Sequence, residues 1–323
     1  MTANNLFEFA RVALPYLGFL YFPASVLLLW AILKTHGAWR LSAAGAFICL
    51  TLMAYGRFIE PKLLVAAEHD IALRGCFPEA GAMRIAVFSD LHVSPYRYAV
   101  SVERIARRVN AKAPDIVFIA GDYVSYLPPD RFDETFAPLR AIKAPVYTVL
   151  GNHDLGLPGP DVAAPLRESL EKLGISVMDD RSADISGETF DVELVGLSDL
   201  WARHQNLALF DTPSSKPRLA LTHNPESIDE ISPENRPELL IAGHTHGGQV
   251  NLPVLTCRMT FACRIARYGY GKVDGGAVFV TSGTGQSMLP IRFAVPPRID
   301  ILNIEYADCP AGPATKQPED DVL

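Results

Sequence analysis

Three short apolar runs in the first half of the chain each stop at a cluster of acidic, amide or imidazole side chains. They are RIAVFSD at 84–90, DIVFIAGD at 115–122 and VYTVLGNHD at 146–154. Runs of this length, rich in Val, Ile and Leu, predict strands that are buried on both faces of a sheet. Because open α/β sheets bind ligands at the carboxyl ends of their strands, the residues that end each run are candidates for a functional site.

Helix and strand patterns around these runs predict the fold. Helix patterns occupy 100–113, 133–144 and 163–174, the last with Gly174 as its C-cap. In the second half strand patterns dominate, and they lie at 189–199, 218–224, 238–246, 277–285 and 298–306. Alternation followed by a strand-rich half predicts an α/β fold, a β-sandwich of two packed sheets flanked by helices, rather than one doubly wound sheet.

The N-terminal region differs in composition from the rest. Residues 12–33 carry no charged side chain and are long enough to cross a bilayer core of about 30 Å as a helix. A second uncharged run, 41–56, is short for a span, but Arg40 and Arg57 flank it and can extend it by reaching the interface. We therefore expect an N-terminal anchor of two transmembrane helices over 1–62, a linker over 63–82, a folded domain over 83–307 and a disordered, Pro-rich acidic tail over 308–323.

Charge and cysteine content bear on the side of the membrane. Basic residues are fewer in the loop between the two runs, which has Lys34 and Arg40, than in the outer flanks, which have Arg11, Arg57, Lys62 and Arg74. This asymmetry favours the cytoplasmic side for the large domain. Five cysteines form no regular framework, and their odd number favours a reducing compartment, although Cys257 and Cys263 could still pair. We expect a multi-pass protein of the cell inner membrane with its large domain in the cytoplasm.

The overall charge limits the partners of the chain. Its formal net charge is -7, whereas nucleic-acid binding needs a basic surface. No internal repeat or heptad pattern is present. We therefore expect no nucleic-acid partner and no obligate protein partner, and the membrane is the expected contact.

Metal-capable side chains lie just past five of the predicted strands. They are Asp90 and His92, then Asp122, then Asn152, His153 and Asp154, then His223, and last His244 and His246. In an extended strand exit, residues i and i+2 point the same way, so each pair of this spacing can face a common centre. Glycines beside these residues permit sharp turns and a close approach of the backbone.

The composition of this set predicts two metal ions. Mixed carboxylate, imidazole and amide ligands suit manganese, iron or zinc, and the absence of cysteine argues against a structural zinc site. A four-coordinate ion uses about four ligands, and the set exceeds that number. Two divalent metal ions with a carboxylate between them can clamp the attacking and leaving oxygens of an in-line displacement, which is what phosphoester hydrolysis needs.

The motifs D-x-H, GD, GNH[DE], H and GHxH, in this order over 83–306, resemble the calcineurin-like metallophosphoesterase superfamily. The stretches RFIEP, GGQVNLP and GTGQSMLPIRF resemble its bacterial membrane-anchored branch, which includes proteins related to a diacylglucosamine pyrophosphatase of lipid A synthesis. The resemblance implies that 83–307 is a calcineurin-like metallophosphoesterase domain with the two-sheet αββα sandwich of that superfamily.

The resemblance also implies a role for each candidate residue. The first ion would be held by Asp90, His92, Asp122 and His246, and the second by Asp122, Asn152, His223 and His244. His153 would be the catalytic proton donor. Asp154 would orient the His153 imidazole and raise its basicity.

Together these expectations describe a membrane-anchored, binuclear-metal phosphohydrolase that cleaves a phosphoester or pyrophosphate bond. A tether raises the effective concentration of the enzyme at the bilayer, which favours a lipid-linked substrate such as UDP-2,3-diacylglucosamine. The alternative is a catalytically inactive scaffold of the same fold that binds a partner at the membrane. Missing ligands would mark such a scaffold, and every motif is complete here.

Overall fold

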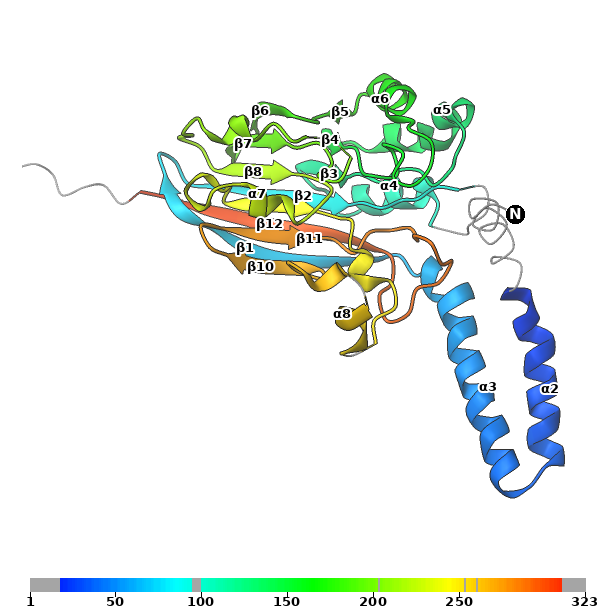
Figure 1. Cartoon of the computed structure of the whole chain (residues 1–323). Coiled ribbons are helices and arrows are strands. Elements are labelled where there is room, and N and C mark those ends of the chain that lie inside the picture. Colours follow the sequence, from blue (N-terminus) through cyan, green and yellow to red (C-terminus); the bar gives the residue numbers. More distant parts are fainter. Residues whose placement is uncertain (1–17, 95–99, 203, 253, 260, 310–323) are drawn as a thin grey trace, which may run out of the picture.

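The computed structural model describes residues 18–94, 100–202, 204–252, 254–259 and 261–309. It contains two six-stranded sheets that pack face to face, with a pair of helices extending from one end (Figure 1). The expected two-sheet sandwich flanked by helices is therefore confirmed.

The first sheet has the strand order β1-β12-β2-β3-β4-β5. Its strands are β1 (Val65–Phe77), β12 (Arg298–Asp308), β2 (Gly81–Phe88), β3 (Ile116–Ala120), β4 (Val146–Val149) and β5 (Ser176–Val177). Strands β2 to β5 are parallel, whereas β12 runs antiparallel to β2 and parallel to β1. The three apolar runs of the first half become β2, β3 and β4, so their polar ends lie at one edge of the sheet.

The second sheet has the order β10-β11-β9-β8-β7-β6. Its strands are β10 (Gly269–Val273), β11 (Gly276–Val280), β9 (Leu239–Ala242), β8 (Arg218–Leu221), β7 (Asp191–Gly196) and β6 (Arg181–Ser186). The four central strands are parallel, and the antiparallel hairpins β10–β11 and β6–β7 close the two edges. The carboxyl ends of β8 and β9 contribute the remaining histidine motifs.

Apolar side chains fill three layers. The central layer, between the sheets, includes Phe118 and Phe279, neither of which is exposed. The outer face of the first sheet is covered by α4 (Val102–Asn110), α5 (Phe132–Phe136) and α6 (Ala163–Lys172). The outer face of the second sheet is covered by loops and the short helix α7 (Ser227–Glu230); α8 (Leu255–Met259) lies in the loop after β9. Packing on both faces holds the strand ends in fixed positions.

The helix patterns become α4, α5 and α6 with shifted boundaries. Ser101 caps α4 by accepting a hydrogen bond from the Arg104 backbone N–H. The second pattern divides into α5 and a 3-10 turn, Ala137–Ala141, at Pro138, which cannot continue an α-helix. Gly174 follows α6 with a φ of 82°, which is the left-handed conformation expected of a C-cap.

The N-terminal helices are α2 (Tyr21–Lys34) and α3 (Gly37–Phe58), which lie side by side and project away from the sandwich (Figure 1). Within the described residues, one helix, Gly37–Lys62, is long and apolar enough to cross a membrane. It contains the second uncharged run, which the sequence marked as the shorter one. The first run forms a shorter apolar helix over Gly18–Lys34, and residues 12–17 lie outside the described part.

The structure differs from the expectation of a linker over 63–82. Residues Val65–Phe77 form β1, which pairs with β12 over most of its length. Buried and exposed residues do not alternate regularly along β1. Charged side chains such as Glu68 and Asp70 are uncommon in strands, so the sequence did not predict a strand here. Helix α3 is therefore followed almost directly by the first sheet.

Two disulfides correct the expectation that the cysteines form no framework. Cys76 at the end of β1 is bonded to Cys309 just after β12, and Cys257 is bonded to Cys263. Cys49, in α3, is a free thiol. The sequence could not reveal the first bond because its two cysteines are 233 residues apart and meet only through the β1–β12 pairing. Of the expected tail, Asp308 ends β12, and residues 310–323 lie outside the described part.

Candidate metal centre

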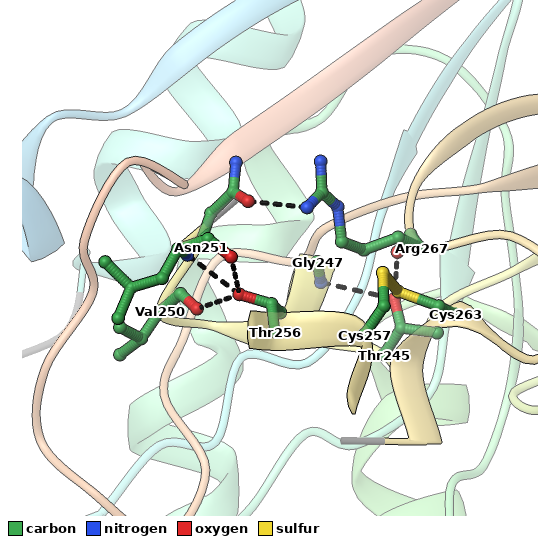
Figure 2. The surroundings of a disulfide bond; sticks show 9 residues. Thr245, Gly247, Val250, Asn251, Thr256, Cys257, Cys263 and Arg267 are labelled. Atoms are coloured by element: carbon green, nitrogen blue, oxygen red, sulfur yellow. Dashed lines mark hydrogen bonds between the residues drawn. A yellow bond between two sulfur atoms is a disulfide. The ribbon is translucent and has the colours of Figure 1, made fainter. Parts of the chain in front are cut away.

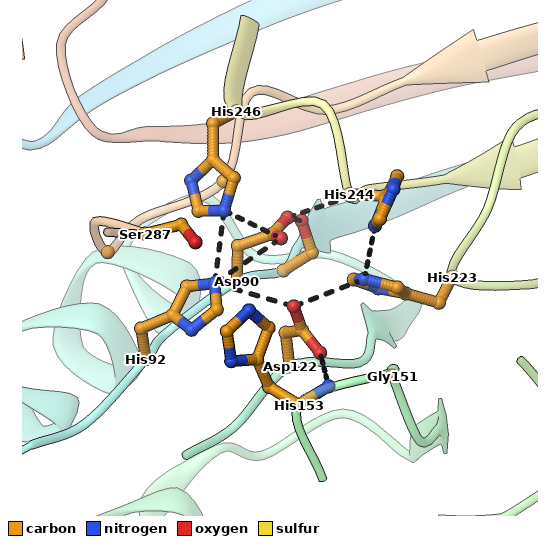
Figure 3. A network of polar contacts seen from close by, with 12 residues as sticks. Asp90, His92, Asp122, Gly151, His153, His223, His244, His246 and Ser287 are labelled. Atoms are coloured by element: carbon orange, nitrogen blue, oxygen red, sulfur yellow. Dashed lines mark hydrogen bonds and ion pairs between the residues drawn. The ribbon is translucent and has the colours of Figure 1, made fainter. Parts of the chain in front are cut away.

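The motifs of the sequence converge at one rim of the sandwich. Asp90 and His92 follow β2, Asp122 follows β3, Asn152 to Asp154 follow β4, His223 follows β8, and His244 and His246 follow β9. Figure 3 shows side chains from both sheets around a common centre; among those labelled are Asp90, His92, Asp122, His153, His223, His244 and His246. Asp90, His92, Asp122, Asn152, Asp154, His223 and His246 are buried, and His153 and His244 are half-buried at the solvent side of the cluster.

Left-handed backbone turns aim these side chains. Asp90, His92, Asp122, His244 and His246 all have positive φ, between 44° and 68°. The extended geometry expected for Asp90 with His92 and for His244 with His246 is therefore wrong, although each pair does converge. Positive φ is uncommon for residues other than glycine and costs about 1 to 3 kcal/mol each, so its concentration here indicates a functional site.

Asp122 lies in the middle of the cluster. Its Oδ2 is 3.4 Å from Nε2 of His92 and 3.2 Å from Nε2 of His223, while its Oδ1 accepts a hydrogen bond from the His153 backbone N–H at 2.9 Å. Gly151 faces this carboxylate, and a Cβ there would overlap Asp122 Oδ1, so the close approach requires glycine. Asp122 therefore places one carboxylate between two groups of imidazoles.

A second part of the cluster surrounds Asp90. The Nε2 atoms of His92 and His246 are 3.0 Å apart, and His246 Nε2 is 3.2 Å from Asp90 Oδ1. Asp90 Oδ2 is held on its other side by the Ser89 hydroxyl and by the His244 backbone N–H. Two imidazole nitrogens directed at each other and at a carboxylate oxygen are a donor set that a divalent cation satisfies.

His223 and His244 form the third part. The His223 ring contacts the Ala120 carbonyl through Nδ1 at 2.7 Å, which leaves its Nε2 directed at Asp122. His244 Nδ1 lies 3.1 Å from His223 Nε2. A carbonyl that accepts the second ring N–H is the usual way in which a protein orients an imidazole ligand.

Asn152 supplies an independent test of whether the residues fit a metal ion. Its amide nitrogen donates to the Leu157 carbonyl, which fixes the orientation of the side chain. Its Oδ1 is buried and accepts no hydrogen bond from the described residues. A buried oxygen without a partner costs about 1 to 3 kcal/mol, and a cation would remove that cost. The residues therefore fit the divalent ions that the motif order implies.

Asp154 has a different role from the one expected. Its carboxylate accepts hydrogen bonds from the backbone N–H groups of Tyr123, Val124 and Gly151, at 2.9 to 3.2 Å. These bonds connect the exit loop of β3 to that of β4. Asp154 is therefore a positioning residue for Asp122 and Asn152, because its oxygens are used on the backbone rather than on the imidazole of His153.

Burial and neighbouring charges shift the pKa values of the cluster. Burial, assisted by the charge of His223, lowers the pKa of His244 to about 3, and burial with the charge of His92 lowers that of His246 well below its usual value. Burial opposes ionisation of Asp122, but the charges of His223 and His153 outweigh it and hold the pKa of Asp122 well below its usual value. Burial also opposes the charged form of His223, but the Asp122 carboxylate outweighs it and raises the pKa of His223 well above its usual value. His244 and His246 are therefore neutral, as metal-binding imidazoles are, beside an ionised Asp122 that is paired with a charged His223.

Three groups of side chains have ligand atoms within 4.8 Å of one another. They are Asp90, His92 and His246; His92, Asp122 and His153; and Asp90, Asp122 and His223. His153 thus lies nearer the expected metal ligands than its expected role as a separate proton donor suggests, with its ring edge-on to that of His92 and the ring centroids 4.6 Å apart. His244 joins the cluster through His223.

Sequence reasoning missed three residues beside the centre. Trp201 packs edge-on against His244 with ring centroids 4.2 Å apart, and the buried Asp199 positions it by accepting the Trp201 backbone N–H. The sequence contained a signal, because the SDL of 198–200 follows a strand just as the SDL of 89–91 does. Arg292, which is fully buried, donates to the carbonyls of Ser282, Gly283, Gly285 and Val295 and had no such signal.

The fold and the site together define a class of protein, a metal-dependent phosphoesterase. Residues 83–248 match the family model for calcineurin-like phosphoesterase. The chain belongs to this family, and the predicted resemblance is confirmed.

Curated relatives agree with this assignment. The chain is 31% identical over 261 residues to the Escherichia coli phosphodiesterase YaeI, which covers 77% of this chain and 92% of the relative. It is 29% identical to a Danio rerio transmembrane protein with a metallophosphoesterase domain, over 83% of this chain and 63% of the relative. It is 22% identical to the Chlamydia muridarum UDP-2,3-diacylglucosamine pyrophosphatase LpxG, over 78% of this chain and 92% of the relative. The membrane-length helix and the transmembrane relative both indicate association with a membrane.

Proposed function

We propose that the chain is a binuclear-metal phosphohydrolase that cleaves a phosphodiester or pyrophosphate bond of a lipid-linked substrate at the membrane surface. The observation that carries the proposal is the position of Asp122 between the imidazoles of His92 and His223. The pyrophosphatase activity named for the chlamydial relative and the anchor helix support a lipid-linked substrate.

The proposed ligand sets follow the geometry of the rim. Asp90, His92, Asp122 and His246 would hold one ion, and Asp122, Asn152, His223 and His244 would hold the other. When bound, divalent ions would supply positive charge for the phosphoryl oxygens and would lower the pKa of a water molecule that attacks phosphorus. Manganese, iron and zinc all suit this donor set.

The protein's own groups complete the reaction. His153 is half-buried at the open side of the cluster, where its imidazole can donate a proton to the leaving oxygen of a substrate that enters from solvent. The His153 backbone N–H donates to Asp122, and this bond fixes the position of the backbone that carries the His153 imidazole. Asp154 connects the loops after β3 and β4 and so holds Asp122 and Asn152 in fixed positions relative to each other.

We also infer that the protein spans the inner membrane with both α2 and α3 and that the large domain faces an oxidising compartment. Two disulfides on the folded domain support this side, since disulfides persist in oxidising compartments and are rare in the cytosol. This replaces the cytoplasmic expectation, which depended on a small excess of basic residues and on the cysteine count. Maleimide labelling during lysis, with and without reduction, tests it: we expect four cysteines to react only after reduction, and labelling of all five without reduction would contradict it.

The activity test uses the full chain in detergent micelles, loaded with Mn²⁺. An aryl phosphodiester, an aryl phosphomonoester and UDP-2,3-diacylglucosamine are offered in parallel. We expect hydrolysis of the diester and of the lipid pyrophosphate. Two bound ions without hydrolysis of any of the three would instead support an inactive scaffold.

A further inference from the structure

An apolar cavity of about 530 Å³ opens beside the metal centre. His244 and His246 line one end, and the remaining wall includes Val250, Leu252, Leu255, Met288 and Leu289. We call this cavity the alkyl groove. It is continuous with the proposed metal site because two of the proposed ligands belong to its lining.

Hydrogen bonds from Gln249 hold the two walls of the alkyl groove together. Its side-chain nitrogen donates to the carbonyls of Ser287 and Leu289, and its oxygen accepts the Ser287 backbone N–H. Gln249 follows His246 by three residues, so the same segment carries a proposed ligand and fixes the Met288–Leu289 wall. Specific hydrogen bonds therefore maintain the shape of the groove.

The other wall is held by the Cys257–Cys263 disulfide and its neighbours (Figure 2). The Thr256 hydroxyl donates to the carbonyls of Val250 and Leu252 and accepts the Leu252 backbone N–H, which closes the turn before α8. The Thr245 hydroxyl donates to the carbonyl of Arg267, which ties the loop after the disulfide to the segment between His244 and His246.

The wall of the alkyl groove also holds the anchor. Three residues beyond Leu289, the Arg292 backbone N–H donates to the carbonyl of Gly56 near the end of α3. A Cβ on Gly56 would lie 2.8 Å from the Arg292 carbonyl oxygen, so only glycine allows this contact. Figure 1 shows α8 on the same side of the sandwich as α2 and α3. The mouth of the groove therefore faces the surface where a bilayer meets the protein.

Exposure of the groove residues agrees with that position. Met288 is 70% exposed, Leu289 50% and Leu255 46%, which is unusual for large apolar side chains in one small region. The polar end of the groove is next to the metal centre. Its lining includes the carboxylate of Glu226, which belongs to the same loop as His223. An amphiphile would thus place its headgroup at the metals and its chain along the groove.

We propose that the alkyl groove binds one hydrocarbon chain of a membrane lipid whose phosphodiester or pyrophosphate lies at the metal centre. The inference depends on the proposed function, and it adds the substrate class: a phospholipid or glycolipid phosphate with an alkyl or acyl chain close to the phosphorus. The occupant is a lipid chain because the groove is apolar, connects to the ligands at one end and reaches the anchor side at the other.

The test measures kcat/KM for a series of aryl alkyl phosphodiesters that differ only in chain length. For the full chain in non-ionic detergent, we expect kcat/KM to rise about fourfold for each methylene that the groove buries, and then to level off. Val254→Glu is the matched control for Met288→Glu. Both side chains are highly exposed, at 73% and 70%, both have positive φ, and only Met288 lines the groove.

The comparison of the two variants removes the effect of micelle partitioning, which acts on both equally. We expect Met288→Glu to lower the ratio of long-chain to short-chain kcat/KM by about tenfold or more, and Val254→Glu to leave it unchanged. Equal ratios in both variants, or a wild type indifferent to chain length, would overturn the groove while leaving the proposed function intact. Absence of hydrolysis for every chain length would instead refute the proposed function. A change of oligomeric state in Met288→Glu alone would assign the groove to contact between copies of the chain.

Discussion

The metal centre and the alkyl groove lie side by side on one rim, but they are built in opposite ways. The metal centre is made of short motifs at strand ends, and buried hydrogen bonds from the backbone to Asp154 connect two of the loops that carry them. The groove is made of long loops held by a disulfide, by Gln249 and by the end of α3. The centre is therefore held rigidly by the two sheets, whereas the shape of the groove depends on cross-links between loops and on the end of α3.

This difference implies that the metal centre determines the chemistry and the groove determines the substrate selectivity. The strand ends carry the groups that any phosphoester needs, and the loops decide which phosphoester can reach them. Changes to the centre should therefore abolish turnover of every substrate, while changes to the groove should act on some substrates only.

The largest effect is expected from Asp122→Ala. Loss of the central carboxylate removes a ligand from both proposed ions, so metal content and turnover should fall together, the latter by at least about 10³-fold. Elemental analysis and steady-state kinetics on the same preparation check this. Full metal content with unchanged turnover would remove Asp122 from the centre.

His153→Ala is expected to slow turnover by about 10² to 10⁴-fold while the metal is retained, as for the loss of a proton donor. A leaving group of low pKa, which needs no proton, should recover most of the rate. Loss of metal equal to that of Asp122→Ala would show that His153 is a ligand, as its place beside His92 and Asp122 allows.

The two disulfides should differ in their effect on stability and on substrate choice. Cys76→Ser with Cys309→Ser opens a loop with a separation of 233 residues and should lower the free energy of unfolding by up to about 5 kcal/mol, with no change in chain-length preference. Cys257→Ser with Cys263→Ser, with a separation of 6, should cost only about 2 kcal/mol but weaken the preference for long chains. Denaturant unfolding and the alkyl series measure both, and the reverse pattern would contradict the division between centre and groove.

The smallest effect is expected from Glu103→Gln on α4, far from both regions. Its ion pair with Arg107 is largely exposed, at 64% and 70%, so the change in unfolding free energy should be below about 0.5 kcal/mol. This variant sets the baseline for the others. A larger loss would mean that surface charge contributes to the stability of this domain more than exposed pairs usually do.

The sequence predicted which side chains gather at the rim, because that information is local. Each ligand lies within a few residues of an apolar run, and parallel strands bring their carboxyl ends to one edge whatever the loops do. The reason given for the convergence was wrong, since Asp90 and His246 have left-handed rather than extended backbones. The role expected for Asp154 also differs from the one in the structure. The sequence does not show that three backbone N–H groups donate to its carboxylate.

The groove could not be predicted, because its walls come from segments around 250 and 288 that are far apart in the sequence. The stretches GGQVNLP and GTGQSMLPIRF indicated a branch of the superfamily, but not that they line one cavity. The pairing of β9 with β11 brings these segments together, and Gln249 then connects them in the folded structure. For the same reason β1 was missed: its partner is β12, more than two hundred residues later, and its charged residues do not alternate regularly. Both the groove and β1 depend on contacts between segments that are distant in the sequence, and local patterns do not reveal such contacts.

The central claim is that a pair of divalent ions around Asp122 performs the hydrolysis. The direct measurement is a titration of the metal-free full chain with Mn²⁺, in which bound metal and hydrolysis of an aryl phosphodiester are recorded at each step. The account predicts two ions bound per chain and activity that appears as the second site fills. Saturation with at most one ion, or activity that persists in the metal-free chain, would contradict it.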